Sequence, residues 1–288
     1  MYLIAALLLF AAPEPATKKP LPPTKTWHVL LADDTGAYWV DVTTGKCTHD
    51  PKLARKPREV VRLNGARQLH VPDHPIRRYG SSFVTTANGV TVRMLKNRLR
   101  LETKDGNKWL TKVGVGHRPV LRPDGKQFAW FKWSENTWSG KSRKANLVIY
   151  DIATGKERVI VKDAQLHEAS WSPDGKTLAV GFDGNLDLYE AATGKRVHRW
   201  VLRDIHDDLY AHGAEGLLWS PDGKTIATRF AFLGGRSADG NGDFEDVFGD
   251  NELYVIDVAS KKVRALKMPK HTCEGPIRAE LRAPQKKK

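Results

Sequence analysis

The sequence has little of what marks a membrane-spanning chain or a serine hydrolase. It contains two cysteines in 288 residues, and neither belongs to a C-x-x-C pair. Its long hydrophobic run covers residues 2–12, which is too short to span a bilayer. It also lacks the G-x-S-x-G sequence that carries the nucleophile of α/β-hydrolases. These absences exclude a spanning helix in that run and a peptidase half of the hydrolase type.

The N-terminal run is instead typical of a signal peptide. It is followed by a stretch rich in Pro, Ala and Lys, and no cysteine for lipid attachment comes directly after it. We predict a signal peptide over residues 1–16, a linker over 17–24 and one domain over 25–288. The expected location is periplasmic or secreted, with a cytoplasmic location as the alternative.

Three near-copies of one decapeptide recur along the chain, and self-similarity of this kind indicates a repeat architecture. They are LRPDGKQFAW (121–130), WSPDGKTLAV (171–180) and WSPDGKTIAT (219–228). Each contains a tight turn, because proline presets φ, aspartate bonds its own backbone and glycine accepts a positive φ. We expect degenerate copies of this turn at VPDH (Pro72) and at APQKK (Pro284).

A second pattern trails the first and occurs five times. It is an apolar stretch that closes on an acid and runs into a Gly-Lys turn, and the five acids are Asp41, Glu102, Asp151, Glu190 and Asp257. The two turns join four short strands into one unit. Four-stranded units repeated at this spacing are the blades of an all-β propeller.

Ring closure is also expected from the sequence. Residues 22–49 resemble the later repeats but lack the strand that precedes the first turn, and residues 277–287 supply such a strand. We therefore predict that the first blade takes its inner strand from the C-terminus. Five blades result, with six as the alternative, because residues 51–97 are long for two strands.

The paired WSPDGK and Y-x-x-D-x-x-TGK motifs resemble the TolB-like family of WD-repeat-related propellers, strongly over residues 120–266. This resemblance implies a shape and leaves the function open, because the motifs are turn and packing signatures. Trp171 and Trp219 occupy the same position in their repeats, and we expect both indoles to pack between blades.

The net charge of +14 is unevenly spread along the chain. Residues 51–118 hold sixteen Lys/Arg and four acids, whereas 239–252 holds six acids and no base. A basic sector of this kind attracts nucleic acid, anionic lipid or polyanionic glycan. Export favours an envelope polymer as the partner, and a solvated face without a partner is the alternative.

Long insertions fall after the second strand of two units, at 133–146 and 234–251, and therefore on one face of the expected ring. The first insertion carries Trp133 and Trp138, which we predict to be ligand-binding. The second has alternating oxygen donors of the kind that calcium requires, although Phe244 stands where a calcium loop places glycine. The predicted ligands are Asp239, Asn241, Asp243, Glu245 and Asp250; a solvated acidic hairpin is the alternative.

Polar residues also recur six positions before each repeat proline, at the start of the innermost strands. They are His117, His167, Glu215 and Arg278. Converging at the channel mouth, they can bind a metal or an anionic ligand, or they can cap the backbone of the neighbouring blade. Closure would also bring Cys47 and Cys273 together, which predicts a disulfide in an exported protein; two free thiols are the alternative.

The favoured function is therefore a non-catalytic, exported binding module whose ligand is a protein or an anionic envelope polymer. It would bind through the face that carries the two insertions. No cofactor is required, and calcium in the acidic loop is the one candidate. An enzyme that acts on carbohydrate or another polymer, with or without a metal, is the alternative. A cytoplasmic protein that contacts nucleic acid through residues 51–118 is the third hypothesis.

Overall fold

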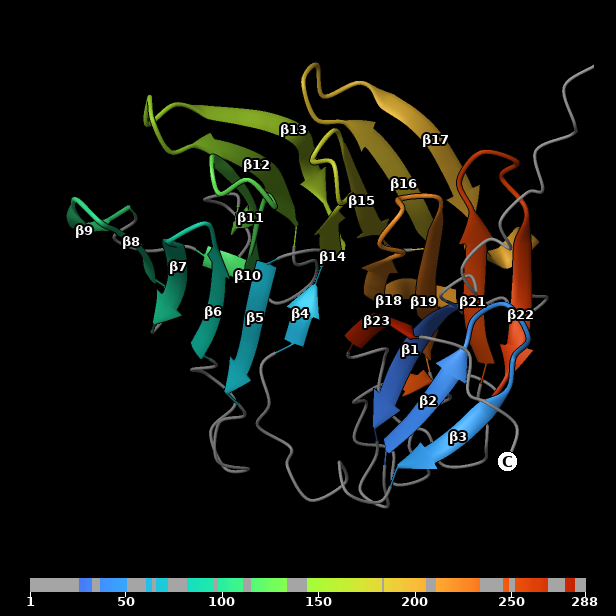
Figure 1. Cartoon of the computed structure of the whole chain (residues 1–288). Helices are drawn as coiled ribbons and strands as arrows, with labels where there is room; N and C mark the ends of the chain where they lie inside the picture. The colour runs from blue at the N-terminus through green and yellow to red at the C-terminus, as the bar shows by residue number, and fades with distance from the viewer. Residues whose placement is uncertain are drawn as a thin grey trace, which may run out of the picture.

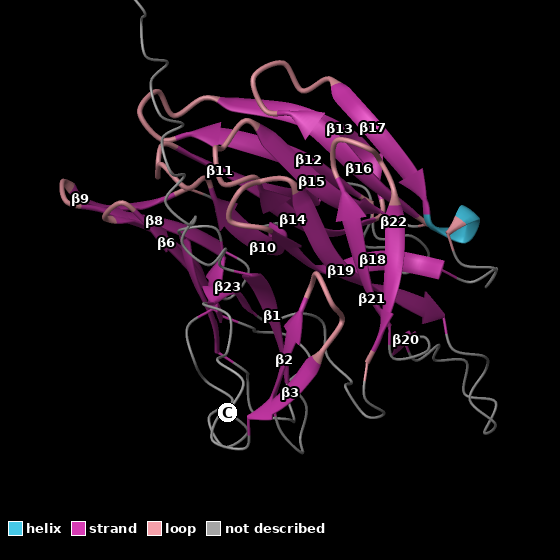
Figure 2. Cartoon of the chain, turned by 45° about the vertical axis from the view of Figure 1, so that its right-hand side comes forward, coloured by secondary structure: helices cyan, strands magenta, loops and turns pink. Residues whose placement is uncertain are grey.

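The structure is a computed structural model that describes residues 26–32, 37–50, 61–63, 66–71, 82–95, 98–110, 115–133, 144–182, 184–205, 211–233, 246–248, 252–268 and 278–282. These residues form antiparallel strands and one short 3-10 helix (Figure 2). Within them, no helix is long and apolar enough to cross a membrane. The predicted signal peptide and linker lie outside the described residues.

The strands group into five sheets, which Figure 1 shows around a common centre. Sheet 1 contains β23 (Arg278–Arg282), β1 (Thr26–Ala32), β2 (Ala37–Asp41) and β3 (Cys47–Asp50). Sheet 2 contains β4 (Val61–Leu63), β5 (Ala66–Val71), β6 (Ser82–Ala87), β7 (Val90–Leu95), β8 (Arg98–Thr103) and β9 (Gly106–Trp109). Sheet 3 contains β10 (Val115–Leu121), β11 (Gln127–Trp133), β12 (Ala145–Asp151) and β13 (Glu157–Ala164).

The last two sheets follow the same order along the chain. Sheet 4 contains β14 (Leu166–Trp171), β15 (Thr177–Phe182), β16 (Asn185–Glu190) and β17 (Arg196–Val201), followed by the 3-10 helix η1 (Leu202–Asp204). Sheet 5 contains β18 (Ala211–Trp219), β19 (Thr225–Leu233), β21 (Glu252–Asp257) and β22 (Val263–Lys267), and β20 (Asp246–Phe248) pairs with β19. The expected all-β propeller of four-stranded units is confirmed in sheets 1, 3 and 4.

The repeated first turn has the geometry that its sequence predicts. Between β14 and β15, the Ser172 hydroxyl donates to Asp174 over 2.7 Å and accepts the Thr177 amide over 2.9 Å. Gly175 adopts a φ of +68°, which only glycine adopts without strain. Ser220 and Asp222 repeat the same contact between β18 and β19 over 2.6 Å. The Ser-Pro-Asp-Gly sequence therefore fixes the first hairpin of sheets 4 and 5.

The acid that ends the third strand shapes the second turn. Asp151 accepts the amide and the hydroxyl of Thr154 over 2.9 and 2.8 Å, and Asp257 does the same with Ser260 over 2.7 Å. Asp41 accepts the Thr43 amide at the equivalent place in sheet 1. The trailing sequence pattern thus marks the turn between the third and fourth strands, as predicted.

The two ends of the chain meet in sheet 1. Strand β1 pairs antiparallel with β23, with Trp27 opposite Leu281 and Leu30 opposite Arg278. The prediction that residues 277–287 contribute the inner strand of this unit agrees with the pairing. No turn can be assigned at Pro284, which lies outside the described residues.

Sheet 2 departs from the sequence-based prediction. Its first turn lies at Asn88 and Gly89, between β6 and β7, where the Asn88 side-chain amide donates to the Pro123 carbonyl of the next repeat turn over 3.2 Å. The first turn of these four strands therefore does not involve Pro72, which lies outside the described residues. Strands β4 and β5 extend the sheet inward beyond β6, and β4 contacts β23 (Figure 1). The long segment before β6 thus adds two strands to this sheet.

Buried side chains join successive sheets in pairs. Separate core clusters lie between sheets 2 and 3, 3 and 4, 4 and 5, and 5 and 1. Trp171 and Trp219 belong to these clusters, and each indole donates to a carbonyl of the preceding sheet, Val120 at 3.0 Å and Ser170 at 3.1 Å. The predicted role of both residues in packing between blades is confirmed.

The outer strands add polar contacts between sheets. Arg158 on β13 donates to the Ala191 carbonyl of sheet 4. Trp200 on β17 donates to the Lys261 carbonyl of sheet 5 over 3.0 Å. Arg264 on β22 donates to the Thr43 carbonyl of sheet 1 over 3.1 Å. Each of these contacts ties an outer strand to the second turn of the following sheet.

Candidate functional site

The predicted axial residues lie at equivalent places in the ring. The backbones of His117, His167, Glu215 and Arg278 belong to β10, β14, β18 and β23, each of which is the first strand of a four-strand repeat. His117 lies opposite Phe131, and Glu215 lies opposite Arg229. The structure thus brings the four positions to the inner strands, as the repeat spacing predicts. Their side chains lie outside what the structure describes.

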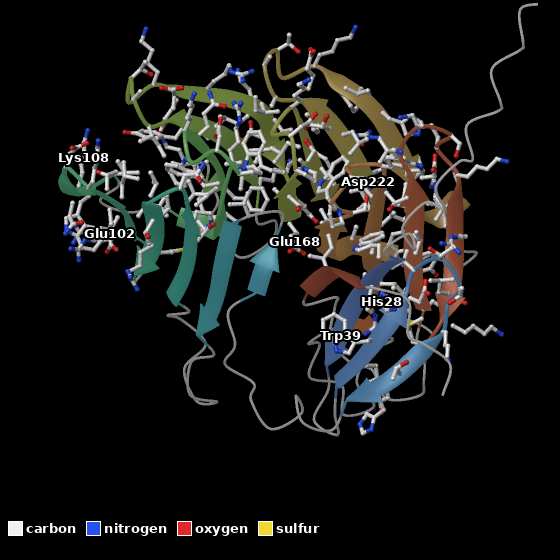
Figure 3. The ribbon with its side chains drawn as sticks, in the orientation of Figure 1. His28, Trp39, Glu102, Lys108, Glu168 and Asp222 are labelled. Carbon is white, nitrogen blue, oxygen red and sulfur yellow. The ribbon has the colours of Figure 1, made fainter. Side chains whose placement is uncertain are left out.

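One described carboxylate on these strands was not predicted. Glu168, near the middle of the ring in Figure 3, accepts a hydrogen bond from the Gly216 amide. Gly216 has a φ of +62° and lies in an irregular part of β18, where the register shifts between Glu215 and Leu218. Glu168 therefore joins two inner strands. Its place next to His167 was the available sequence signal.

The second strand of sheet 5 contains a buried arginine. Arg229 on β19 is 1% exposed, and its cross-strand neighbour is Glu215. A charged group is rarely buried to this extent unless it is paired. The inner end of sheet 5 is therefore charged and shielded from water.

Both insertions leave the ring at this same end of the strands. The first follows β11, whose Lys132 lies opposite Val115 at the start of β10. The second follows β19, whose Phe232 lies opposite Ala211 at the start of β18. The axial positions and the two insertions consequently share one face of the sheets.

Little of the insertions themselves is described. Trp133, at the base of the first insertion, is partly buried against the cluster between sheets 3 and 4. Trp138 lies outside the described residues, as do the proposed calcium ligands Asp239, Asn241, Asp243, Glu245 and Asp250. Among the residues that the structure does describe, no group of three or more His, Cys, Asp or Glu could hold a metal ion. The calcium site stays a prediction.

The predicted disulfide is likewise untested. Within the described residues Cys47 forms no disulfide, and its sulfur lies 3.6 Å from the Gly45 carbonyl oxygen. Burial raises the pKa of this thiol, which lowers its reactivity. Cys273 lies outside the described residues, so the pairing stays a prediction.

The opposite face carries the repeat turns. The aspartates of these turns accept hydrogen bonds from neighbouring residues of the same turn. Burial alone would raise the pKa of Asp174, but hydrogen bonds from Ser172 and the Lys176 amide outweigh it and hold the pKa below its usual range. The same balance lowers the pKa of Asp222, labelled in Figure 3. These carboxylates shape turns and are poorly suited to take up protons in catalysis.

An ion pair within sheet 4, between a buried aspartate and an exposed arginine, is also structural. Asp187 is 0% exposed and accepts two hydrogen bonds from Arg199, at 2.7 and 2.8 Å. It also accepts the Tyr189 hydroxyl over 3.0 Å. Burial and the Asp187 charge raise the pKa of Tyr189 far above its usual range. The carboxylate is satisfied inside the sheet and faces no ligand.

Comparisons with known proteins bear on the fold. Residues 122–231 match the family model for the N-terminal region of dipeptidyl peptidase IV. No curated protein matches the chain significantly. Similar solved structures include a chain of a nidogen/laminin complex, with 10% identity, a TM-score of 0.53 and coverage of 88% of this chain and 97% of that one.

Two further solved structures overlap less well. TolB from Acinetobacter baumannii is 14% identical with a TM-score of 0.40, covering 88% of this chain and 55% of that one. The propeller domain of the trilobed protease from Pyrococcus furiosus is 12% identical with a TM-score of 0.40, covering 65% and 54%. Identities this low concern the fold alone. Together with the radial antiparallel sheets, the family match and the nidogen/laminin likeness identify the chain as an all-β propeller.

Proposed function

We propose that this propeller is a non-catalytic binding module, exported to the periplasm or beyond the cell, whose ligand is a protein or an anionic envelope polymer. Residues 1–16 would be its signal peptide, 17–24 its linker and 25–288 its single binding domain. The ligand would contact the face that carries the 133–146 and 234–251 insertions. This face would include His117, His167, Glu215, Arg278, Trp133 and Trp138.

One observation carries the proposal. The two long connections leave β11 and β19 at the end of the sheets where β10 and β18 begin, with Lys132 opposite Val115 and Phe232 opposite Ala211. Long variable loops over a rigid scaffold are where propeller-like proteins place binding residues. The other face, by contrast, consists of short turns whose side chains bond to their own backbone.

The test is to shorten one insertion without touching the sheets. Residues 134–144 would be replaced by a short Gly-Ser hairpin, and sedimentation of the chain from an envelope extract would be compared with wild type. A matched control would replace the exposed Thr154 and Thr193 by serine in turns of the opposite face. We expect wild type and control to sediment as a complex and the shortened chain to sediment alone. Identical sedimentation of all three would contradict the proposal.

A second function has one observation in its favour. The matched family model describes part of a peptidase, and the axial positions include residues capable of acid–base chemistry. A propeller enzyme that acts on carbohydrate or another polymer, with or without a metal, is therefore the alternative. Depolymerisation that disappears in both His167→Gln and Glu215→Gln, with binding retained, would favour it.

A further inference from the structure

The two surfaces of sheet 2 differ in a way that sheets 3, 4 and 5 do not share. Four consecutive residues are buried in the third strands of those sheets, at 147–150, 186–189 and 253–256. In sheet 2 burial alternates: Val92 and Met94 are buried while Thr91 and Arg93 are half-exposed, and β8 repeats the pattern. Alternation of this kind indicates a sheet that is covered on one side.

The covered side of sheet 2 is the one that faces sheet 3. Val92, Met94, Leu99 and Leu101 belong to the core cluster with Leu121, Phe128 and Trp130. Among the described residues, no comparable cluster joins sheet 2 to sheet 1, and the contact between these sheets is made by β4 and β23. The other side of β7, β8 and β9 therefore lies outside the apolar core.

This other side presents one continuous group, which we call the basic face: Arg93, Arg98, Arg100, Glu102 and Trp109. Register places Arg93, Arg100 and Trp109 side by side on three neighbouring strands. Figure 3 shows Glu102 at the outer edge of the molecule, near Lys108 at the end of the sheet. The basic face thus lies at the rim of the molecule.

Its side chains are already organised around one another. Glu102 lies 3.2 Å from Arg93 and 3.4 Å from Arg100. The guanidinium carbon of Arg98 lies 4.4 Å from the centre of the Trp109 ring, and that of Arg100 lies 5.9 Å from it. Two guanidinium groups contact the one carboxylate and a third lies over the indole, so the face keeps an excess of positive charge beside an aromatic ring.

Trp109 lies on the side of sheet 2 that faces away from sheet 3. It pairs with Arg100, which stands between the buried Leu99 and Leu101 of β8. Those two leucines pack toward sheet 3, so Arg100 and Trp109 are on the opposite side of the sheet. The indole of Trp109 is 45% exposed. The basic face therefore includes an exposed aromatic ring.

We infer that the basic face is a binding surface for an acidic polysaccharide. Planar guanidinium groups bind carboxylates or sulfates through paired hydrogen bonds. The open side of the indole offers an apolar surface to the C–H groups of a sugar ring. Glu102 can accept hydrogen bonds from the neutral hydroxyls that a polysaccharide carries between its acidic groups.

Charge complementarity indicates that the basic face is covered by an acidic polysaccharide and not by a neighbouring segment of the chain itself. Residues 90–109 carry six Lys/Arg and two acids, and the preceding segment 51–81 is also strongly basic. Covering the basic face with that segment would oppose like charges. The inference deepens the proposed function by naming the class of polymer, but it concerns a different surface from the insertion face.

The test is affinity electrophoresis of the full chain in gels that contain polygalacturonate, with neutral dextran as the reference polymer. We expect retardation by polygalacturonate that weakens with salt. The double variant R98Q/R100Q should bind about tenfold more weakly, which corresponds to about 1.4 kcal/mol. W109A, which leaves the charge unchanged, should weaken binding by roughly threefold, as expected for an exposed cation–π and stacking site.

Two controls distinguish specific binding at the basic face from nonspecific attraction to the positive charge of the whole chain. K195Q/K224Q removes two exposed lysines on the repeat-turn face and should bind as wild type. R98K/R100K keeps the charge but loses the planar guanidinium groups, and should bind more weakly than wild type. Near-UV circular dichroism of each variant would verify that the fold is retained.

Several results would overturn the inference. The affinity for polygalacturonate could fall equally in K195Q/K224Q and R98Q/R100Q, it could stay at the wild-type value in R98K/R100K, or it could be unchanged in W109A. Tighter binding of polyglutamate or single-stranded DNA than of polygalacturonate would also overturn it, in favour of a peptide or nucleic-acid partner. Failure of the loop-shortening test would leave these measurements unaffected, because none of the variants touches residues 134–144.

Discussion

The guanidinium of Arg264 donates a hydrogen bond of 3.1 Å to the carbonyl of Thr43, which precedes it by 221 residues in the chain. It also contacts the Val42 carbonyl. Together with the pairing of β1 and β23, this contact holds the first and last sheets together. Arg158 makes the equivalent contact between sheets 3 and 4, which are neighbours in sequence.

Arg264→Gln should loosen sheet 1 specifically. Loss of the hydrogen bonds should cost about 1 kcal/mol of unfolding free energy. Amide exchange should rise in β2 and β3, since these strands pack on sheet 5 and lie beside the lost contact. Hydrogen exchange read by mass spectrometry measures both quantities.

Arg158→Gln is the matched control for that variant. It removes an equivalent arginine between sheets 3 and 4, where it makes no contact with sheet 1, so exchange in β2 and β3 should not change. If both variants raise exchange in sheet 1 equally, Arg264 has no special role in holding the chain ends together.

Trp219→Phe should lower the free energy of unfolding more than Trp130→Phe does. Both indoles are almost fully buried, at 1% and 2% exposure. The Trp219 nitrogen donates to Ser170, whereas that of Trp130 has no hydrogen-bond partner within the described part of the chain. In Trp219→Phe the Ser170 carbonyl loses its hydrogen-bond donor, which should add about 1–3 kcal/mol to the loss of unfolding free energy. Urea unfolding compares the two variants, and equal losses would show that ring volume alone matters.

Gly181→Ala should destabilise the junction between sheets 4 and 5. A β-carbon there would lie 2.4 Å from the Ala214 carbonyl oxygen, a backbone atom that cannot move alone. We expect the free energy of unfolding, measured by urea titration, to fall by about 1–3 kcal/mol, as for other overpacked cores. Gly181 is not among the glycines with a positive φ, so this loss would report packing and not backbone strain. Wild-type stability of Gly181→Ala would refute the close packing.

Asp222→Asn should lower the stability of the fold at neutral pH, and this difference from wild type should become smaller in acid. The folded-state pKa of Asp222 is lowered, so its charged form stabilises the fold above the unfolded-state pKa of about 3.9. That contribution disappears as the pH falls through the lowered pKa. The difference in urea midpoint between wild type and variant should therefore be larger at about pH 7 than at about pH 2.5. A difference independent of pH would exclude the Ser220–Asp222 bond as its source.

Much of the fold is predictable because turn chemistry repeats locally. Pro, Asp and Gly in one order specify the first hairpin, and an acid before Thr or Ser specifies the second, as at Asp151 and Thr154. The terminal pairing followed from the strand that residues 22–49 lack. Sheet 2 was harder, because its β6–β7 hairpin turns at Asn88-Gly89, without the Pro-Asp-Gly sequence that marks the other units.

The candidate sites were less predictable, because they depend on contacts between distant segments. Glu168 and Gly216 meet only when two inner strands lie side by side. The basic face had a signal in the alternation of VTVRML and RLRLET, where every second residue is apolar. Its significance depends on knowing that only one side of sheet 2 packs on sheet 3.

The measurement that tests the binding proposal most directly is photo-crosslinking from one residue on each face. A photoreactive amino acid would replace Trp138 in the first insertion or Thr154 in a turn of the opposite face, and cells would be irradiated before envelope extraction. We expect adducts of the chain from position 138 and none from position 154. Adducts from position 154 alone, or equal adducts from both, would contradict the proposal.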